Sequence, residues 1–106
     1  MSYRELNSYQ DFNSFPIKDR WTNCTVGLEH SVSGDDYWLT CSIKFFVGDV
    51  SDLHIHIGRG SRSDANLVLS TLEANGFKQT IKRYMREWEY FDYQRIPVQD
   101  DSENST

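Results

Sequence analysis

Two histidines, His54 and His56, are separated by a single residue in a short stretch where polar and apolar residues alternate. On a strand this spacing places both imidazoles on one face, an arrangement that metal sites use. Zinc would need a third and usually a fourth ligand, and His30 is expected on the opposite face of the sheet. Two histidines without a third ligand are more often half-exposed strand residues. The sequence therefore predicts no metal and no cofactor, and leaves His54 and His56 as minor metal candidates.

A glycine- and arginine-rich segment follows, running Gly58-Arg-Gly-Ser-Arg-Ser63 into a predicted helix. Free backbone N–H groups at the start of a helix, with Arg59 and Arg62 beside them, could hold an anion such as phosphate. The segment matches neither the dinucleotide fingerprint nor the P-loop, because it lacks the final glycine of one and the lysine of the other. In the alternative interpretation, the glycines allow a tight turn and the arginines keep it soluble. Arg59 and Arg62 are therefore a secondary, anion-binding candidate.

Nucleophilic and acid–base catalysis find little support in the sequence. Cys24 and Cys41 are expected on the apolar face of two strands, where a thiol is inert, and their spacing forms no metal or redox motif. No serine stands in a recognisable nucleophile elbow. The adjacent acids Asp35 and Asp36 occupy a turn, and solvated neighbours of this kind do not make an acid–base pair. The chain is therefore not expected to be an enzyme.

The clearest local pattern is a pair of strands around the turn Ser33-Gly-Asp-Asp36. Apolar and polar residues alternate on both sides, over 24–32 and over 37–47. A four-residue loop pairs Val32 with Tyr37, which brings the two apolar faces together. Residues on the other face of this hairpin include Glu29, Trp38, Lys44 and Phe46.

A third strand is predicted over Asp52–Gly58, where isoleucine and histidine alternate. Its odd-numbered apolar residues join the core only if the turn over Gly48–Ser51 has an odd length, for example a three-residue loop with a bulge. His54 and His56 then lie on the other face, beside Lys44.

Helices are expected before and after these strands in the chain, and they are expected to pack mainly on one face of the sheet. A capping box and apolar residues at near-helical spacing predict a first helix over about residues 3–13. Ser63 is the expected N-cap of a second helix, which Asn75-Gly76 ends. Residues 77–91 predict a last amphipathic helix, although 88–98 also suits a strand. The predicted fold is α+β, a three-stranded antiparallel sheet with flanking helices in the order α-β-β-β-α-α, with a fourth strand near the C-terminus as the alternative.

The order helix, three strands, helix resembles that of double-stranded RNA-binding domains in topology alone. Those domains have a Gly-Pro-x-His-type loop between the first two strands and lysines at the start of the second helix. This chain has Ser33-Gly-Asp-Asp36 and Ser61-Arg-Ser-Asp-Ala65 at these places. Carboxylates there would repel phosphate, so RNA binding is not expected.

The 106-residue length and the charge distribution set the expected organisation. One globular domain is predicted over residues 1–98, followed by an acidic disordered tail over 99–106. The formal net charge of −5 argues against direct contact with nucleic acid and favours a protein partner with a basic surface. No signal peptide or membrane-spanning run is recognisable, so a cytoplasmic location is expected and a membrane partner is not.

The expected function is that of a small non-catalytic protein-binding protein, most specifically an acidic inhibitor or immunity protein that blocks a basic partner such as a nuclease toxin. The fifteen aromatic residues could supply interface anchors with a polar rim. Two alternatives stay open: a small metal- or phosphate-dependent enzyme, and a subunit whose aromatic face is an oligomer contact. It also stays open whether the last helix covers that face. The residues predicted to contact the partner are Glu29, Asp35, Asp36, Trp38, Lys44, Phe46, His54 and His56.

Overall fold

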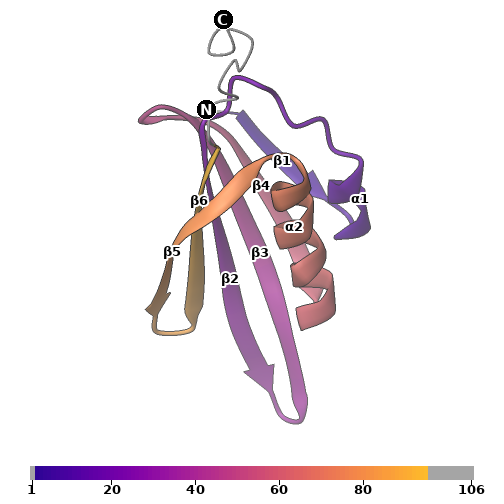
Figure 1. The fold of residues 1–106 in the computed structure, drawn as a ribbon. Helices are drawn as coiled ribbons and strands as arrows, with labels where there is room; N and C mark the ends of the chain where they lie inside the picture. Colours follow the sequence, from indigo (N-terminus) through magenta and orange to yellow (C-terminus); the bar gives the residue numbers. More distant parts are fainter. Residues whose placement is uncertain (1, 96–106) are drawn as a thin grey trace, which may run out of the picture.

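The computed structural model describes residues 2–95, which form one six-stranded sheet and two helices (Figure 1). The strand order in the sheet is β1-β4-β3-β2-β6-β5, with β1 parallel to β4 and all other neighbours antiparallel. The predicted acidic tail over 99–106 lies outside the described residues. The elements are β1 (Ser2–Leu6), α1 (Gln10–Asn13), β2 (Asn23–Ser33), β3 (Asp36–Val47), β4 (Val50–Gly60), α2 (Arg62–Ala74), β5 (Phe77–Met85) and β6 (Trp88–Arg95).

The fold differs from the predicted three-stranded sheet with flanking helices. The predicted helix over 3–13 is wrong, because its first half is β1 and only Gln10–Asn13 is helical. The predicted helix over 77–91 is also wrong, because these residues belong to β5 and β6. The reason is the sheet itself: a helix there would leave the backbone N–H and C=O groups along the outer edge of β2 without strand partners. Strand β6 supplies those partners.

The central three strands confirm the predicted pairing. Val32 lies opposite Tyr37 in the β2–β3 hairpin, and Ile55 of β4 lies opposite Ile43 of β3. The odd offset between β3 and β4 comes from a bulge next to the turn, where Asp52 is the additional residue on β4. Long β2 and β3 extend well beyond the helices at the lower end of Figure 1.

The core lies between the sheet and the two helices. Helix α2 buries Ala65, Val68 and Leu72 against the strands, and it lies in front of the sheet in Figure 1. Stacked aromatic rings fill the other part of the core, with the rings of Trp21 and Phe45 4.2 Å apart. The largest fully buried side chains are Trp21, Tyr93, Phe12, Phe45, Leu28, Leu39, Ile43, Ile55, Ile57, Leu72, Val26 and Val68.

Both cysteines are buried and free, as predicted for small core residues. Burial raises the pKa of the Cys24 and Cys41 thiols well above the ordinary range. A protonated thiol without solvent contact is not a nucleophile, so these residues act as packing groups.

Helix α2 begins two residues earlier than predicted. Ser61 is the N-cap in place of Ser63, and it forms a capping box with Asp64. The predicted end of the helix is confirmed, since Asn75 is the C-cap and Gly76 has a φ of 89°. Neither helix of the described chain has the length and apolar character needed to cross a membrane.

Candidate functional site: the uncovered face of the sheet

The two helices pack on the same face of the sheet, so within residues 2–95 no element lies over the opposite face. We call this second surface the uncovered face. Its side chains alternate along each strand with the core residues and are mostly half-buried. The uncovered face includes Thr25, Gly27, Glu29, Trp38, Thr40, Ser42, Lys44, Phe46, His54, His56, Trp88, Tyr90 and Asp92.

One row of side chains crosses five strands of this face. The register aligns Tyr3, His54, Lys44, Thr25 and Asp92 on β1, β4, β3, β2 and β6. The ring of Tyr3 meets the His54 imidazole edge-on, with 5.3 Å between centroids. The Thr25 hydroxyl donates a hydrogen bond of 2.9 Å to the Asp92 carboxylate. Cross-strand pairing therefore places the exposed side chain of Lys44 between those of His54 and Thr25.

His54 is held as a neutral group on this row. Its Nε2 lies 2.7 Å from the Ser42 hydroxyl oxygen. Partial burial lowers the pKa of His54, and electrostatic interactions with Lys44 and His56 lower it further. The imidazole is therefore uncharged at neutral pH and available for hydrogen bonding. The Lys44 amine forms no ion pair with any carboxylate among the described residues.

Two aromatic rings of β6 lie beside this row. Trp88 and Tyr90 are stacked, with centroids 5.6 Å apart and planes at 7°. Gly27 makes room for them, because a Cβ at this position would lie 3.0 Å from Tyr90 and 3.2 Å from Trp88. The result is a shallow pocket of about 190 Å³ on the uncovered face. Its lining residues are Thr25, Gly27, Ser42, Lys44, His54, Trp88 and Tyr90.

Trp38 stands near the far end of the same face and is held by an arginine. The Arg59 guanidinium carbon lies 3.6 Å from the centroid of the Trp38 ring. A β-bulge in β4, opposite Leu39–Cys41, brings Arg59 to this side of the sheet. Cation–π contact fixes the indole in one orientation while leaving it half-exposed.

The structure brings most of the predicted contact residues onto one face, but not into one compact site. Glu29, Trp38, Lys44, Phe46, His54 and His56 share the uncovered face. Asp35 and Asp36 are exposed at the turn of the β2–β3 hairpin. From Asp36 to Phe46 the strand spans roughly 33 Å. Only an extended surface contact, and not a small ligand, could engage the whole set.

The predicted anion loop is divided between the two faces. Arg59 covers Trp38 on the uncovered face, whereas the Arg62 guanidinium pairs with Glu89 on the helix side at 2.8 Å. The two arginines therefore do not converge on a common ligand.

The two metal candidates do not acquire a third ligand. Among residues 2–95, no group of three or more histidine, cysteine, aspartate or glutamate side chains could hold a metal ion. His30 faces the helix side of the sheet, where its Nε2 lies 3.2 Å from Glu89. His54 and His56 therefore form a histidine pair on the uncovered face of β4, and His54 is hydrogen-bonded to Ser42.

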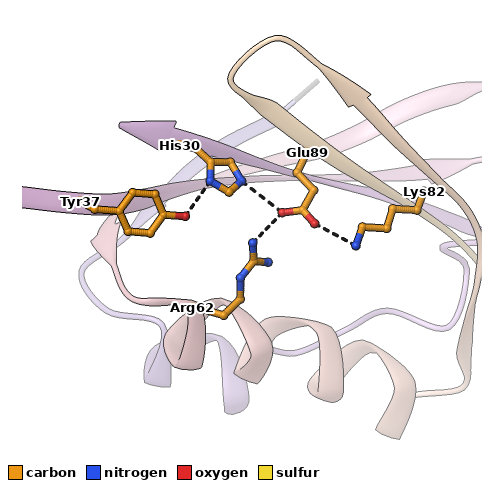
Figure 2. A network of polar contacts seen from close by, with 5 residues as sticks. All are labelled: His30, Tyr37, Arg62, Lys82 and Glu89. Atoms are coloured by element: carbon orange, nitrogen blue, oxygen red, sulfur yellow. Dashed lines mark hydrogen bonds and ion pairs between the residues drawn. The ribbon is translucent and has the colours of Figure 1, made fainter. Parts of the chain in front are cut away.

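A second polar cluster, on the helix side, centres on the buried carboxylate of Glu89 (Figure 2). Arg62 of α2 lies 2.8 Å from its Oε1, and Lys82 of β5 lies 3.0 Å from its Oε2. His30 of β2 approaches Oε1 at 3.2 Å, and the Tyr37 hydroxyl lies 2.6 Å from His30 Nδ1. Figure 2 shows the side chains of His30, Arg62 and Lys82 pointing toward the Glu89 carboxylate, with the Tyr37 hydroxyl next to His30.

Glu89 is ionised throughout the neutral range. Burial raises the pKa of its carboxyl, but hydrogen bonds from Arg62, Lys82 and His30 outweigh burial and lower the pKa to about 2. A carboxylate with so low a pKa is a poor general base, because it does not take up a proton near pH 7. The ion pairs of Glu89 with Arg62 and Lys82 therefore tie α2 to the last hairpin.

Sequence reasoning gave a strand over 88–98 only as the alternative to a helix, and it placed none of the β6 residues in the candidate site. Trp88, Tyr90 and Asp92 face one side of the strand, and Glu89 and Phe91 face the other. This alternation is visible in the sequence, but the apolar spacing of 77–91 also fits a helix. The pairing partner that decides between them, β2, lies about sixty residues earlier in the chain.

The comparisons with known proteins give no relatives. No protein-family model, no curated protein and no solved structure matches this chain at a significant level.

Proposed function

We propose that this chain is a non-catalytic protein-binding protein and that its partner lies against the uncovered face. The observation that carries the proposal is a pair of half-buried tryptophans, Trp38 and Trp88, on a sheet face over which the described chain places nothing. Tryptophan is enriched among the side chains that dominate binding energy in protein interfaces. Covering both indoles would release water from a large apolar area. We expect this binding to occur in the cytoplasm.

Both tryptophans are positioned before any partner arrives. Arg59 covers the Trp38 ring, and Tyr90 stacks on Trp88. Anchors that are already ordered lose little side-chain entropy on binding, so more of the contact energy remains as affinity.

The proposed partner has a basic surface. Asp35 and Asp36 are exposed and are separated from Trp38 in the chain only by Tyr37, and Glu29 is paired in register with Trp88. The tryptophan end of the uncovered face is therefore flanked by carboxylates, in a chain with a net charge of −5. Complementary charge raises association rates and selects among partners. The proposed subtype is an inhibitor or immunity protein that covers a basic functional surface, such as that of a nuclease.

Affinity capture from the native cell at low salt tests this proposal, with three versions of the chain as bait. The first is the natural chain, the second carries Trp38→Ala, and the third carries Tyr84→Ala. Tyr84 is a matched control, because it is 70% exposed but pairs with Glu89 and faces the helix side. We expect one stoichiometric basic protein with the natural chain and with Tyr84→Ala, and its loss with Trp38→Ala.

The same experiment can contradict the proposal. Equal recovery of the protein by all three baits would place the contact elsewhere on the molecule. Recovery that persists at high salt would contradict the proposal that the partner is basic, because salt screens contacts between exposed charges. Denaturant unfolding of the Trp38→Ala chain confirms that its loss of binding is not a loss of folding.

A further inference from the structure

A second concave site lies at the β1 edge of the sheet, on the helix side and away from the uncovered face. Strand β1, the segment between α1 and β2, and the start of β4 enclose a pocket of about 260 Å³. This volume lies just below the roughly 300 Å³ at which drug-sized sites begin, so it suits a small ligand. Its lining residues are Ser2, Arg4, Phe15, Pro16, Lys18, Arg20, Trp21, Asp52 and Leu53.

The pocket is positively charged in an otherwise acidic chain. Three cations line it, Arg4, Lys18 and Arg20, together with one carboxylate, Asp52. That single carboxylate is already engaged, because it accepts hydrogen bonds from the Trp21 indole at 2.7 Å and from Arg20 at 2.8 Å. These hydrogen bonds, and the positive charges of Arg20 and Lys18, lower the pKa of Asp52. It therefore stays ionised and its charge is balanced locally.

The other two cations have no carboxylate partner in the described part of the chain. Neither Arg4 nor Lys18 takes part in any ion pair between residues 2–95. Arg4 lies over the Phe15 ring, 5.3 Å from its centroid. A guanidinium on an aromatic face, an amine and an apolar floor therefore share one pocket.

We propose that this pocket binds a small phosphomonoester that carries an apolar group. A phosphate group is mostly dianionic at neutral pH, and so matches two cations that lack partners. The planar guanidinium of Arg4 can donate two parallel hydrogen bonds to phosphate oxygens, and Lys18 supplies a point charge. Phe15, Pro16 and Leu53 offer the apolar part of the ligand a surface to cover. This site is independent of the protein contact proposed above.

Titration with phenyl phosphate, followed by the indole N–H signals in ¹H–¹⁵N NMR spectra, tests the proposal on the full chain. The three tryptophans give one such signal each, and only Trp21 is at the pocket. We expect the Trp21 signal to move with a dissociation constant of about 1 mM or lower, while those of Trp38 and Trp88 stay in place. A Trp21 signal that does not move at about 10 mM phenyl phosphate would overturn the proposal.

Two matched probes separate the contributions of charge and ring. Benzoate has the ring with one negative charge, and inorganic phosphate has the charge without the ring. Both should bind several-fold more weakly than phenyl phosphate. Benzoate binding as tightly as phenyl phosphate would contradict the preference for a phosphate dianion. Equal binding of inorganic phosphate would show that the apolar floor plays no part.

Variants locate the site. Arg4→Gln or Lys18→Gln should each weaken phenyl phosphate binding by about tenfold, because each removes a charge-assisted hydrogen bond. Both side chains are exposed, so these changes leave the core intact. Lys78→Gln is the control, since it removes the same charge from exposed β5, at the opposite edge of the sheet. Equal weakening by Lys78→Gln would reduce the effect to net charge and refute the site.

Discussion

Single residues of the last hairpin decide what each face of the sheet presents. Trp88 and Tyr90 point to the uncovered face, whereas Glu89 between them points to the helix side, because successive side chains of a strand alternate. One strand therefore supplies both the aromatic surface that we propose for binding and the carboxylate that ties the sheet to α2.

Gly27→Ala tests how the aromatic pair is positioned. The new Cβ would lie 3.0 Å from Tyr90 and 3.2 Å from Trp88, so the stacked rings must shift outward. We expect a changed near-UV circular dichroism spectrum, with the free energy of unfolding within about 1 kcal/mol of the natural chain, because alanine is the better strand residue. Gly58→Ala is the control, since a Cβ there meets nothing within 4 Å. An unchanged spectrum for Gly27→Ala would show that the glycine does not control the stack.

Glu89→Gln should destabilise the chain by about 2 kcal/mol near pH 7, because it leaves Arg62 and Lys82 without a charged partner. The figure is below that for fully buried pairs, since both cations are partly exposed. Urea unfolding of the two chains measures the difference.

The pH dependence of this effect has a definite sign. The pKa of Glu89 is about 2 in the folded chain, below its ordinary value of 4.5, so the unfolded chain takes up the proton first as pH falls. The contribution of Glu89 is therefore fully present above about pH 5 and disappears as pH falls toward 2. The gap in unfolding free energy between the natural chain and Glu89→Gln should close over that range. A gap independent of pH would mean that packing, not ionisation, explains the loss.

At the scale of elements, short local signals set the ends of helices and strands. The bulge in β4 brings Arg59 over Trp38, and the serine-rich segment that follows starts α2. Two serines in this segment, Ser61 and Ser63, are both acceptable N-cap residues by sequence. In the structure the N-cap is Ser61.

Ser61→Ala should reduce the free energy of unfolding by about 1 kcal/mol, because its hydroxyl accepts the Asp64 N–H at the start of α2. Ser63→Ala should change stability by less than about 0.5 kcal/mol, since this residue is exposed within the helix. Thermal or urea unfolding of both variants gives the comparison. The reverse order of effects would place the helix start at Ser63, as the sequence alone suggests.

At the scale of the whole molecule, we expect net charge to control the rate of association with the proposed partner. With a net charge of −5 and carboxylates around the tryptophan end of the uncovered face, encounter with a basic protein should be electrostatically steered. We expect the association rate constant to fall by at least about tenfold between low and high salt, with a smaller change in the dissociation rate. Stopped-flow or surface-based kinetics with the captured partner measures both rates. A salt-independent association rate would argue that apolar contacts alone bring the two together.

The sequence by itself determined the middle of the fold. Alternation along β2, β3 and β4 identifies which residues are buried, and the turn between β2 and β3 sets their register. These signals are local, because hairpin partners are neighbours in the chain and a slip of one residue would expose the apolar face. The placement of His54, Lys44 and Trp38 on one shared face follows from the same logic.

Only the tertiary structure decided the two edges of the sheet. Residues 2–6 and 77–95 are strands because β1 and β6 pair with edges of β4 and β2 that would otherwise have no partner. Those partner strands lie far away in the sequence. Strand pairing at those edges satisfies backbone groups that helical residues would leave unpaired, and this outweighs the local helical spacing. The same long-range pairing assembles the Glu89 cluster and leaves one face of the described sheet uncovered.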